Sequence, residues 1–120
     1  MKKIGLLPCS GACNVGTLSN KAVINTLEDK NDTDFVCALG LPLGIEGIIK
    51  RGKESDDYIA VNGCKVKCAS KALSSADIDF DKEVIITENF EMDKSGNLKS
   101  EENLNRIETH LKSLVDELRE

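Results

Sequence analysis

The 120-residue chain has a single histidine, no excess of basic residues and no long apolar run. With 16 Lys and Arg against 21 Asp and Glu, its net charge is −5. This argues against nucleic-acid binding, which requires a basic surface that displaces counterions. No apolar run approaches the ~20 residues needed to cross a bilayer, so we expect no membrane partner. The histidine, His110, lies far along the chain from Ser10, the serine beside a glycine, which argues against a serine hydrolase.

The length of the chain and its cysteine count together limit the classes of protein to which it can belong. A chain of this length suits one domain, so we predict a single domain over residues 1–120. The apolar stretch near the N-terminus is shorter than the roughly 7–15 residues of a signal sequence and is interrupted by Pro8. We therefore expect a cytoplasmic protein, in which thiols stay reduced. Five cysteines in such a chain indicate metal or thiol chemistry rather than a disulfide framework.

Short apolar runs alternate with longer segments of helical periodicity. We predict four strands, at Ile4–Pro8, Asp34–Leu39, Tyr58–Val61 and Glu83–Thr87. We predict helices from Thr17 or Ser19 to about Asp29, at Ile45–Arg51, at about residues 66–76, and an amphipathic helix at residues 101–120. Strands that alternate with helices pair in parallel through right-handed crossovers. The predicted fold class is a small three-layer α/β domain with a mainly parallel sheet of about four strands.

The cysteines fall where the predicted strands end. Cys9 follows the first strand, Cys37 lies in the last half of the second, and Cys64 follows the third. Cys13 and Cys68 each lie four residues beyond another cysteine, in a loop or the first turn of a helix. Because the carboxyl ends of parallel strands share one edge, where sites of open α/β sheets form, we expect several thiols to converge there. Helix N-termini at that edge favour thiolates.

Several kinds of chemistry fit converging thiols. Four cysteine sulfurs in a tetrahedron hold a structural zinc ion, and four also suit an iron–sulfur cluster. A metal-free thiol–disulfide protein could use Cys64 with Cys68 or Cys9 with Cys13, although such pairs normally have two intervening residues. The plainest alternative is that free cysteines are small core residues, which applies most to Cys37 in its apolar run.

At residues 62–73 the segment NGCKVKCASKAL resembles the DGC family, which is named for a central Asp-Gly-Cys motif and described as zinc-binding. The segments CSGACNVGTLSNKAV, FVCAL and KEVIITENFEM resemble the family's N-terminal cysteine segment, middle cysteine strand and closing strand, so the resemblance covers about residues 4–92. It implies a zinc site whose ligands are Cys9, Cys37, Cys64 and Cys68, with Cys13 as an alternate ligand. Asn62 stands where the motif has aspartate, which keeps the turn chemistry but removes a negative charge.

A weaker resemblance supplies an enzyme hypothesis. The segment CALGLPLG is similar to small desulfidases, which hold a [4Fe-4S] cluster by three cysteines and leave one iron open for substrate. In that interpretation Cys13 or Cys68 acts as a catalytic thiol, and the basic residues at 50–53 attract a small anionic or sulfur-containing ligand. Our leading prediction is a cytoplasmic metal-binding protein with a cysteine-ligated zinc site at the carboxyl edge of the sheet. We assign no catalytic residue, and whether the protein is an enzyme stays open.

Overall fold

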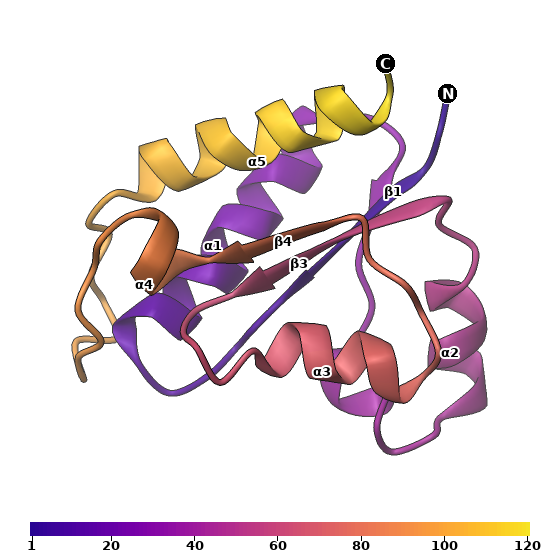
Figure 1. Cartoon of the computed structure of the whole chain (residues 1–120), viewed down its shortest axis with the longest axis horizontal. Helices are drawn as coiled ribbons and strands as arrows, with labels where there is room; N and C mark the ends of the chain where they lie inside the picture. The colour runs from indigo at the N-terminus through magenta and orange to yellow at the C-terminus, as the bar shows by residue number, and fades with distance from the viewer.

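The computed structural model describes residues 1–120 and contains one sheet of four parallel strands in the order β2-β1-β3-β4. The strands are β1 (Ile4–Pro8), β2 (Thr33–Asp34), β3 (Asp57–Asn62) and β4 (Lys82–Ile85). The helices are α1 (Asn14–Asp29), the 3-10 helix η1 (Ala38–Gly40), α2 (Glu46–Gly52), α3 (Cys68–Ser75), α4 (Ile86–Asn89) and α5 (Leu104–Leu118). In Figure 1, α1 and α5 lie on one side of the sheet and α2 and α3 on the other.

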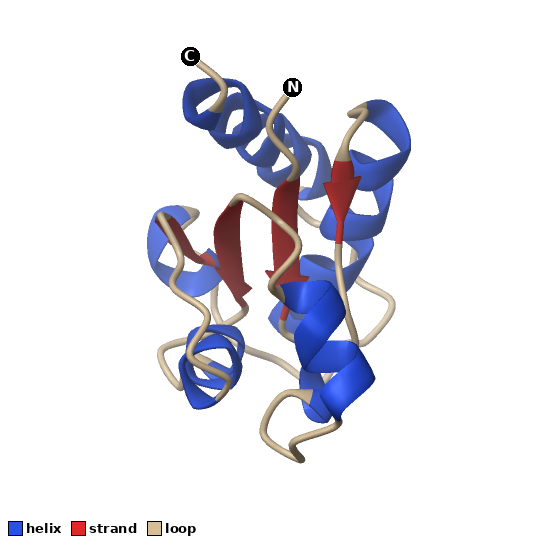
Figure 2. Cartoon of the chain, turned by 90° about the vertical axis from the view of Figure 1, so that its right-hand side faces the viewer, coloured by secondary structure: helices blue, strands red, loops and turns tan.

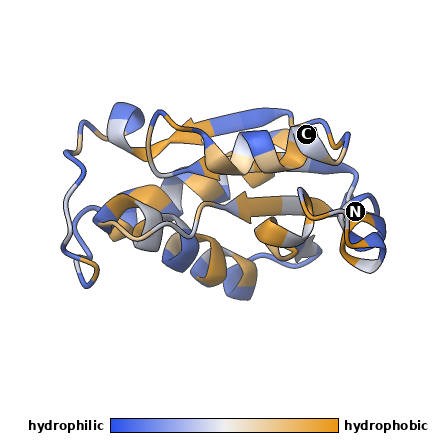
Figure 3. Cartoon of the chain, turned by 90° about the horizontal axis from the view of Figure 1, so that it is seen from below, coloured by the Kyte–Doolittle hydropathy of each residue, from blue (hydrophilic) through white to orange (hydrophobic).

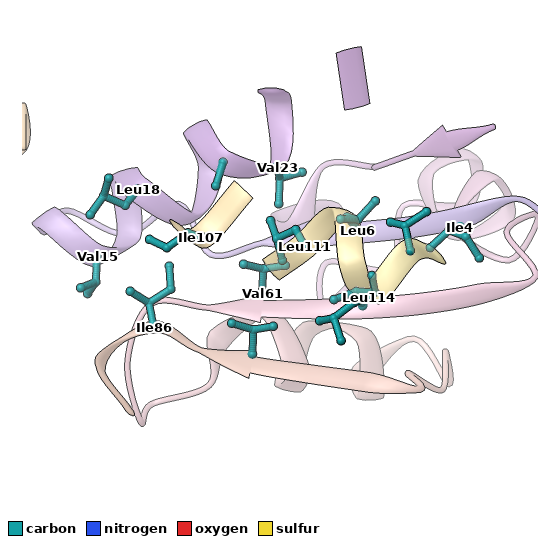
Figure 4. Packing of buried hydrophobic residues seen from close by; sticks show 14 of the residues in the cluster. Ile4, Leu6, Val15, Leu18, Val23, Val61, Ile86, Ile107, Leu111 and Leu114 are labelled. Atoms are coloured by element: carbon teal, nitrogen blue, oxygen red, sulfur yellow. The ribbon is translucent and has the colours of Figure 1, made fainter. Parts of the chain in front are cut away.

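The two central strands send alternate side chains into two separate cores. Leu6 of β1 and Val61 of β3 are fully buried in the core that α1 and α5 cover, and Figure 4 shows this cluster between the strands and the helices. The neighbouring Leu7 and Ala60 face the other way and are fully buried in the core on the α3 side. Figure 2 shows the strands with helices on both sides. The three-layer α/β prediction is therefore confirmed.

The helices are amphipathic, as covering helices must be, and Figure 3 shows hydrophobic and hydrophilic segments side by side on them. Helix α5 is the clearest case: Ile107, Leu111 and Val115 are fully buried against the sheet. Burying each of these side chains contributes roughly 1.5–3 kcal/mol.

At the end of α5 the Arg119 guanidinium donates to the carbonyls of Lys2, Asn31 and Asp32, which fixes the helix against the amino edge of the sheet. None of the helices has the length and apolarity needed to cross a membrane.

The second strand was predicted wrongly. Strand β2 covers only residues 33–34, so Cys37 lies beyond it, at the start of η1. The apolar residues that follow β2 fold over the α2 and α3 face: Val36 and Leu41 are buried there, whereas Leu39 is 66% exposed. A short apolar run predicts that its residues are buried, but it does not show whether they are buried in a strand or in a tight turn.

Two further boundaries differ from prediction. Helix α1 begins at Asn14 rather than at Thr17 or Ser19, because the Asn14 amide donates to the Ser95 carbonyl (2.9 Å), a partner distant in sequence. The run EVIIT at residues 83–87 divides into the end of β4 and the start of α4. The Asn89 side chain accepts a hydrogen bond from the Ile85 amide (2.7 Å), and this contact helps to end the strand there.

Candidate functional site

Cys9 is held in place by the backbone on both of its sides. It follows β1 directly, and its amide donates to the Val61 carbonyl of β3 (2.9 Å), continuing the parallel ladder by one more bond. Its carbonyl accepts a hydrogen bond from the hydroxyl of Ser19, a fully buried residue of α1. The first cysteine therefore sits at the carboxyl edge of the sheet, as predicted, with little backbone freedom.

Asn62, the last residue of β3, fixes the start of α3. It is fully buried, and its Oδ1 accepts from the amides of Ala69 (3.0 Å) and Ser70 (3.1 Å). Its Nδ2 donates to the Ser70 hydroxyl (2.8 Å), which in turn donates to Glu83 Oε2 (2.7 Å). Cys68 is the first residue of α3, so its position depends on this cap from the neighbouring strand. The Ser70 hydroxyl lowers the pKa of Glu83, aided by the Lys67 ammonium.

Two glycines let the cysteine segments pack on the start of α1. A Cβ added to Gly63 would lie 2.9–3.0 Å from backbone atoms of Val15 and Gly16. A Cβ added to Gly16 would lie 2.6 Å from the Gly11 carbonyl oxygen. Separations this short leave no room for a side chain, so the Cys9–Cys13 segment, the first turn of α1 and the turn at residues 62–64 form one closely packed unit.

Cys9, Cys64 and Cys68 all lie at this edge, and the first two are near enough to the third to affect its ionisation. Partial burial raises the pKa of the Cys68 thiol. The neighbouring Cys9 thiol raises the pKa of Cys68 further, and so does the Cys64 thiol. The Lys71 ammonium acts in the opposite direction. We refer to these three cysteines as the thiol site.

A lysine from a distant segment lies against the thiol site. Lys94 Nζ is 3.7 Å from Cys64 Sγ. The backbone beside it is fixed by Asn14, whose Nδ2 donates to the Asp93 carbonyl (2.9 Å) and whose Oδ1 accepts from the Ser95 amide (2.7 Å). Asn14 is only 4% exposed, so the Asn14 end of these bonds is shielded from water. The ammonium can therefore provide positive charge to an anionic sulfur or to an anion bound beside it.

The other two cysteines are not among the thiols that act on Cys68. Cys13 is the N-cap residue of α1 and packs, half-buried, against the core under α1 and α5. Cys37 is exposed and lines a surface cavity with Phe35, Ile48 and Arg51. As the side chains stand, no group of three or more His, Cys, Asp or Glu residues is arranged to hold a metal ion. The four-cysteine ligand set therefore stays a prediction.

Sequence reasoning did not identify Lys94 or Asn14 as parts of this region. Lys94 lies in a polar connection 30 positions from Cys64, and nothing in its local pattern distinguishes it from a solvated surface lysine. The capping role of Asn62 was also missed, because a capping residue normally lies two or three positions before the amides that it binds. Here the amides lie seven and eight positions further on. Residues 62–63 carried only a turn signal.

The donor chemistry of the thiol site suits a thiophilic cation. Three sulfurs supply soft ligands, which select zinc, copper(I) or iron–sulfur centres over magnesium or calcium. All five cysteines are free thiols, so each can in principle be deprotonated on binding a metal ion. Thiols at one edge of the sheet also suit thiol–disulfide chemistry. The residues present are therefore compatible with either metal or thiol chemistry.

Comparison with known proteins identifies the family. The DGC domain matches residues 5–113, which is nearly the whole chain and extends past the segment of about 4–92 that carried the resemblance into most of α5. No curated protein and no solved structure shows a significant match. The chain therefore belongs to the DGC-domain family.

Proposed function

We propose that the protein binds a thiophilic metal ion, with zinc as the first candidate, in a reducing compartment such as the cytoplasm. The observation that carries this proposal is that Cys9, Cys64 and Cys68, which come from separate parts of the sequence, lie at one edge of the sheet, after β1, after β3 and at the start of α3. Membership of the DGC family supports metal binding. The five free thiols support a reducing compartment, because oxidising compartments favour disulfides.

The ligands that we propose are Cys9, Cys64 and Cys68, completed by Cys37 or, as the alternate, Cys13. A closed tetrahedral zinc site requires four ligands with sulfur about 2.3 Å from the metal. Cys37 lies in an exposed turn, whereas Cys13 is fixed at the N-cap of α1 and packs on the core. Cys37 also lines a surface cavity with Pro8 and Ser10, the residues on either side of Cys9, which makes it the first candidate to complete the site. Such a closed site suits storage, delivery or sensing of the ion rather than catalysis.

The test is elemental analysis of protein purified without oxygen and without added metal, combined with a visible absorption spectrum of the same sample. We expect a colourless protein with about one zinc per chain. Cys64→Ser should reduce the metal content several-fold, and the matched variants Cys37→Ser and Cys13→Ser identify which residue completes the site. Unchanged metal content in Cys64→Ser would remove that residue from the site, and unchanged content in both Cys64→Ser and Cys68→Ser would refute the proposed location.

A second candidate function is favoured by the number of thiols that converge. Three neighbouring cysteines, rather than four, match the ligand set of a [4Fe-4S] cluster that leaves one iron open for substrate. Lys94, at 3.7 Å from Cys64 Sγ, would then stabilise a small anionic or sulfur-containing ligand at the open position. A brown protein with about four irons and matching acid-labile sulfide would support this function over zinc binding.

A further inference from the structure

We propose that Cys9 and Cys68 form a reversible intramolecular disulfide, which makes the thiol site sensitive to the redox state of its surroundings. This pair differs from the two Cys-x-x-x-Cys pairs that the sequence suggests. Cys9 follows β1 and Cys68 begins α3, 59 positions apart, yet the segments that carry them are hydrogen-bonded to adjacent residues of β3. No local sequence pattern marks them as partners, because the fold alone brings them together.

The backbones of both cysteines are attached to the same two residues of β3. The Cys9 amide donates to the Val61 carbonyl (2.9 Å). The next residue along β3, Asn62, binds the amides of Ala69 and Ser70, directly after Cys68 in the first turn of α3. Val61 and Asn62 are themselves fully buried. The backbone at each cysteine is thus anchored to the same buried end of β3.

Such a pair is preorganised for disulfide formation. A disulfide forms readily when the two backbones already stand at the correct separation, and strain or backbone movement is costly otherwise. Here the segments that carry the two cysteines are anchored to the neighbouring residues Val61 and Asn62 of β3 before any oxidation takes place. Cys64 shares the site, but it lies in the turn that leaves β3, and Cys9 raises the pKa of Cys68 more than Cys64 does.

The reaction is thiol–disulfide exchange with a low-molecular-weight disulfide of the glutathione type. Cys68 reacts first because it is exposed whereas Cys9 is half-buried, and it attacks as the thiolate, so the reaction is faster at higher pH because its pKa is raised. Its sulfur attacks one sulfur of the reagent, forms a mixed disulfide and releases one small thiol. The Cys9 thiolate then attacks Cys68 Sγ, forms the intramolecular bond and releases the second small thiol. The protein dithiol loses two electrons and two protons, and the reagent disulfide gains them as two thiols.

The consequence for metal binding rests on the proposed function. A disulfide between Cys9 and Cys68 removes two of the three sulfurs of the thiol site as ligands, because a disulfide sulfur is no longer a thiolate. Cys64 would be the only remaining thiolate of the three. Oxidation should therefore release a bound metal ion, and reduction should restore binding.

The experiment equilibrates the metal-free, folded protein with mixtures of oxidised and reduced glutathione, followed by alkylation and peptide mapping without reduction. We expect the five free thiols to fall to three, with one disulfide joining the peptides that contain Cys9 and Cys68. Either Cys9→Ser or Cys68→Ser should abolish this intramolecular bond. The matched variants Cys13→Ser and Cys37→Ser should leave it unchanged.

Several results would overturn the inference. They are a dominant Cys64–Cys68 or Cys9–Cys13 disulfide in the folded protein, accumulation of mixed disulfides alone, or no oxidation. Repeating the oxidation in urea gives the necessary contrast, since the unfolded chain should form several pairings and lose the preference. A Cys9–Cys68 fraction that is as high in urea as in buffer would show that the fold does not select the pair.

The same samples separate this inference from the proposed function. Protein loaded with zinc is oxidised in the presence of a chromophoric zinc chelator, and release of zinc is compared with formation of the disulfide. A specific Cys9–Cys68 disulfide in a protein that never binds zinc would support the inference and contradict zinc binding. Stable zinc binding in a protein whose Cys9 and Cys68 do not pair on oxidation would contradict the inference alone.

Discussion

Replacing Asn62 by alanine tests whether one buried amide positions the thiol site. The substitution removes the acceptor of the Ala69 and Ser70 amides and the donor to the Ser70 hydroxyl. Loss of a helix cap costs about 0.5–2 kcal/mol, and leaving a buried donor unsatisfied costs about 1–3 kcal/mol. Ala69 and Ser70 are at most 5% exposed, so water does not readily replace the lost acceptor. We therefore expect Asn62→Ala to lower the free energy of unfolding by about 2–4 kcal/mol.

The aspartate variant provides the matched comparison. Asn62→Asp retains an oxygen for both amides and places a negative charge at the N-terminus of α3, which favours anions by about 0.3–1 kcal/mol. The aspartate lacks only the side-chain donor to the Ser70 hydroxyl. Ser70 has one hydroxyl proton, and in the variant both the introduced carboxylate and Glu83 compete to accept it. We expect a loss of stability smaller than that of Asn62→Ala, by about 1 kcal/mol or more.

The assay is urea denaturation followed by far-ultraviolet circular dichroism, because the chain has no tryptophan to report by fluorescence. Asn97→Ala serves as a control, since Asn97 is exposed and outside every helix and strand. The same variants should be oxidised with glutathione, because a loosened α3 should reduce the preference for the Cys9–Cys68 disulfide. If Asn62→Ala destabilises no more than Asn97→Ala, the hydrogen bonds described for Asn62 do not fix α3 and the reasoning fails.

Three other variants or titrations test the surroundings of the site and of the core. Gly63→Ala should lower the free energy of unfolding by about 1–3 kcal/mol, because its Cβ would overlap backbone atoms of Val15 and Gly16; wild-type stability in urea would contradict this. Asn14→Ala should cost about 1–3 kcal/mol through loss of its buried bonds to residues 93–95, and amides 93–98 should exchange hydrogen faster; unchanged exchange would contradict the role of Asn14. Burial raises the pKa of Tyr58, the only tyrosine, to about 12, so tyrosinate absorbance should rise near that pH when folded and near 10.0 in urea. Because the folded pKa is the higher one, this group's contribution to stability is complete below pH 10.0 and is lost as the pH rises towards about 12; identical titrations would contradict its burial.

The layers of the fold could be predicted because the central strands have a strong pattern. Strands β1 and β3 are buried on both faces, and such strands read as continuous apolar runs bounded by turn signals. The buried stripe of α5 likewise recurs at helical spacing. Two-sided burial and regular alternation with helices leave few topologies besides a parallel sheet covered on both faces.

The position of Cys37 could not be predicted from the same kind of pattern. The run DFVCAL is apolar because Val36 and nearby residues enter the core, but they do so from a turn and from η1. This turn approaches α2 closely at Gly40: a Cβ added there would lie 2.3 Å from the Ile48 side chain. That contact depends on tertiary structure, which local propensity does not encode.

The partners of individual cysteines were also beyond sequence reasoning. The rule that sites form at the carboxyl edge of a parallel sheet predicted that thiols from different strands would converge. It did not indicate which thiols would act on Cys68. The start of α3 is positioned by the bonds from Asn62 to Ala69 and Ser70, and these partners are seven and eight positions away in the sequence.

The three residues of the motif at 62–64 thus have different physical roles. Asn62 caps α3 through its side-chain oxygen, Gly63 allows contact with the backbone of α1, and Cys64 supplies a thiol beside Lys94. An aspartate at the first position has the same oxygen acceptors, so it can perform the same capping role. An acid–base role for that position is unnecessary to explain why the motif begins with a small polar residue. The substitution of aspartate by asparagine in this chain is therefore compatible with an intact thiol site, and the comparison of Asn62→Asp with Asn62→Ala tests that interpretation directly.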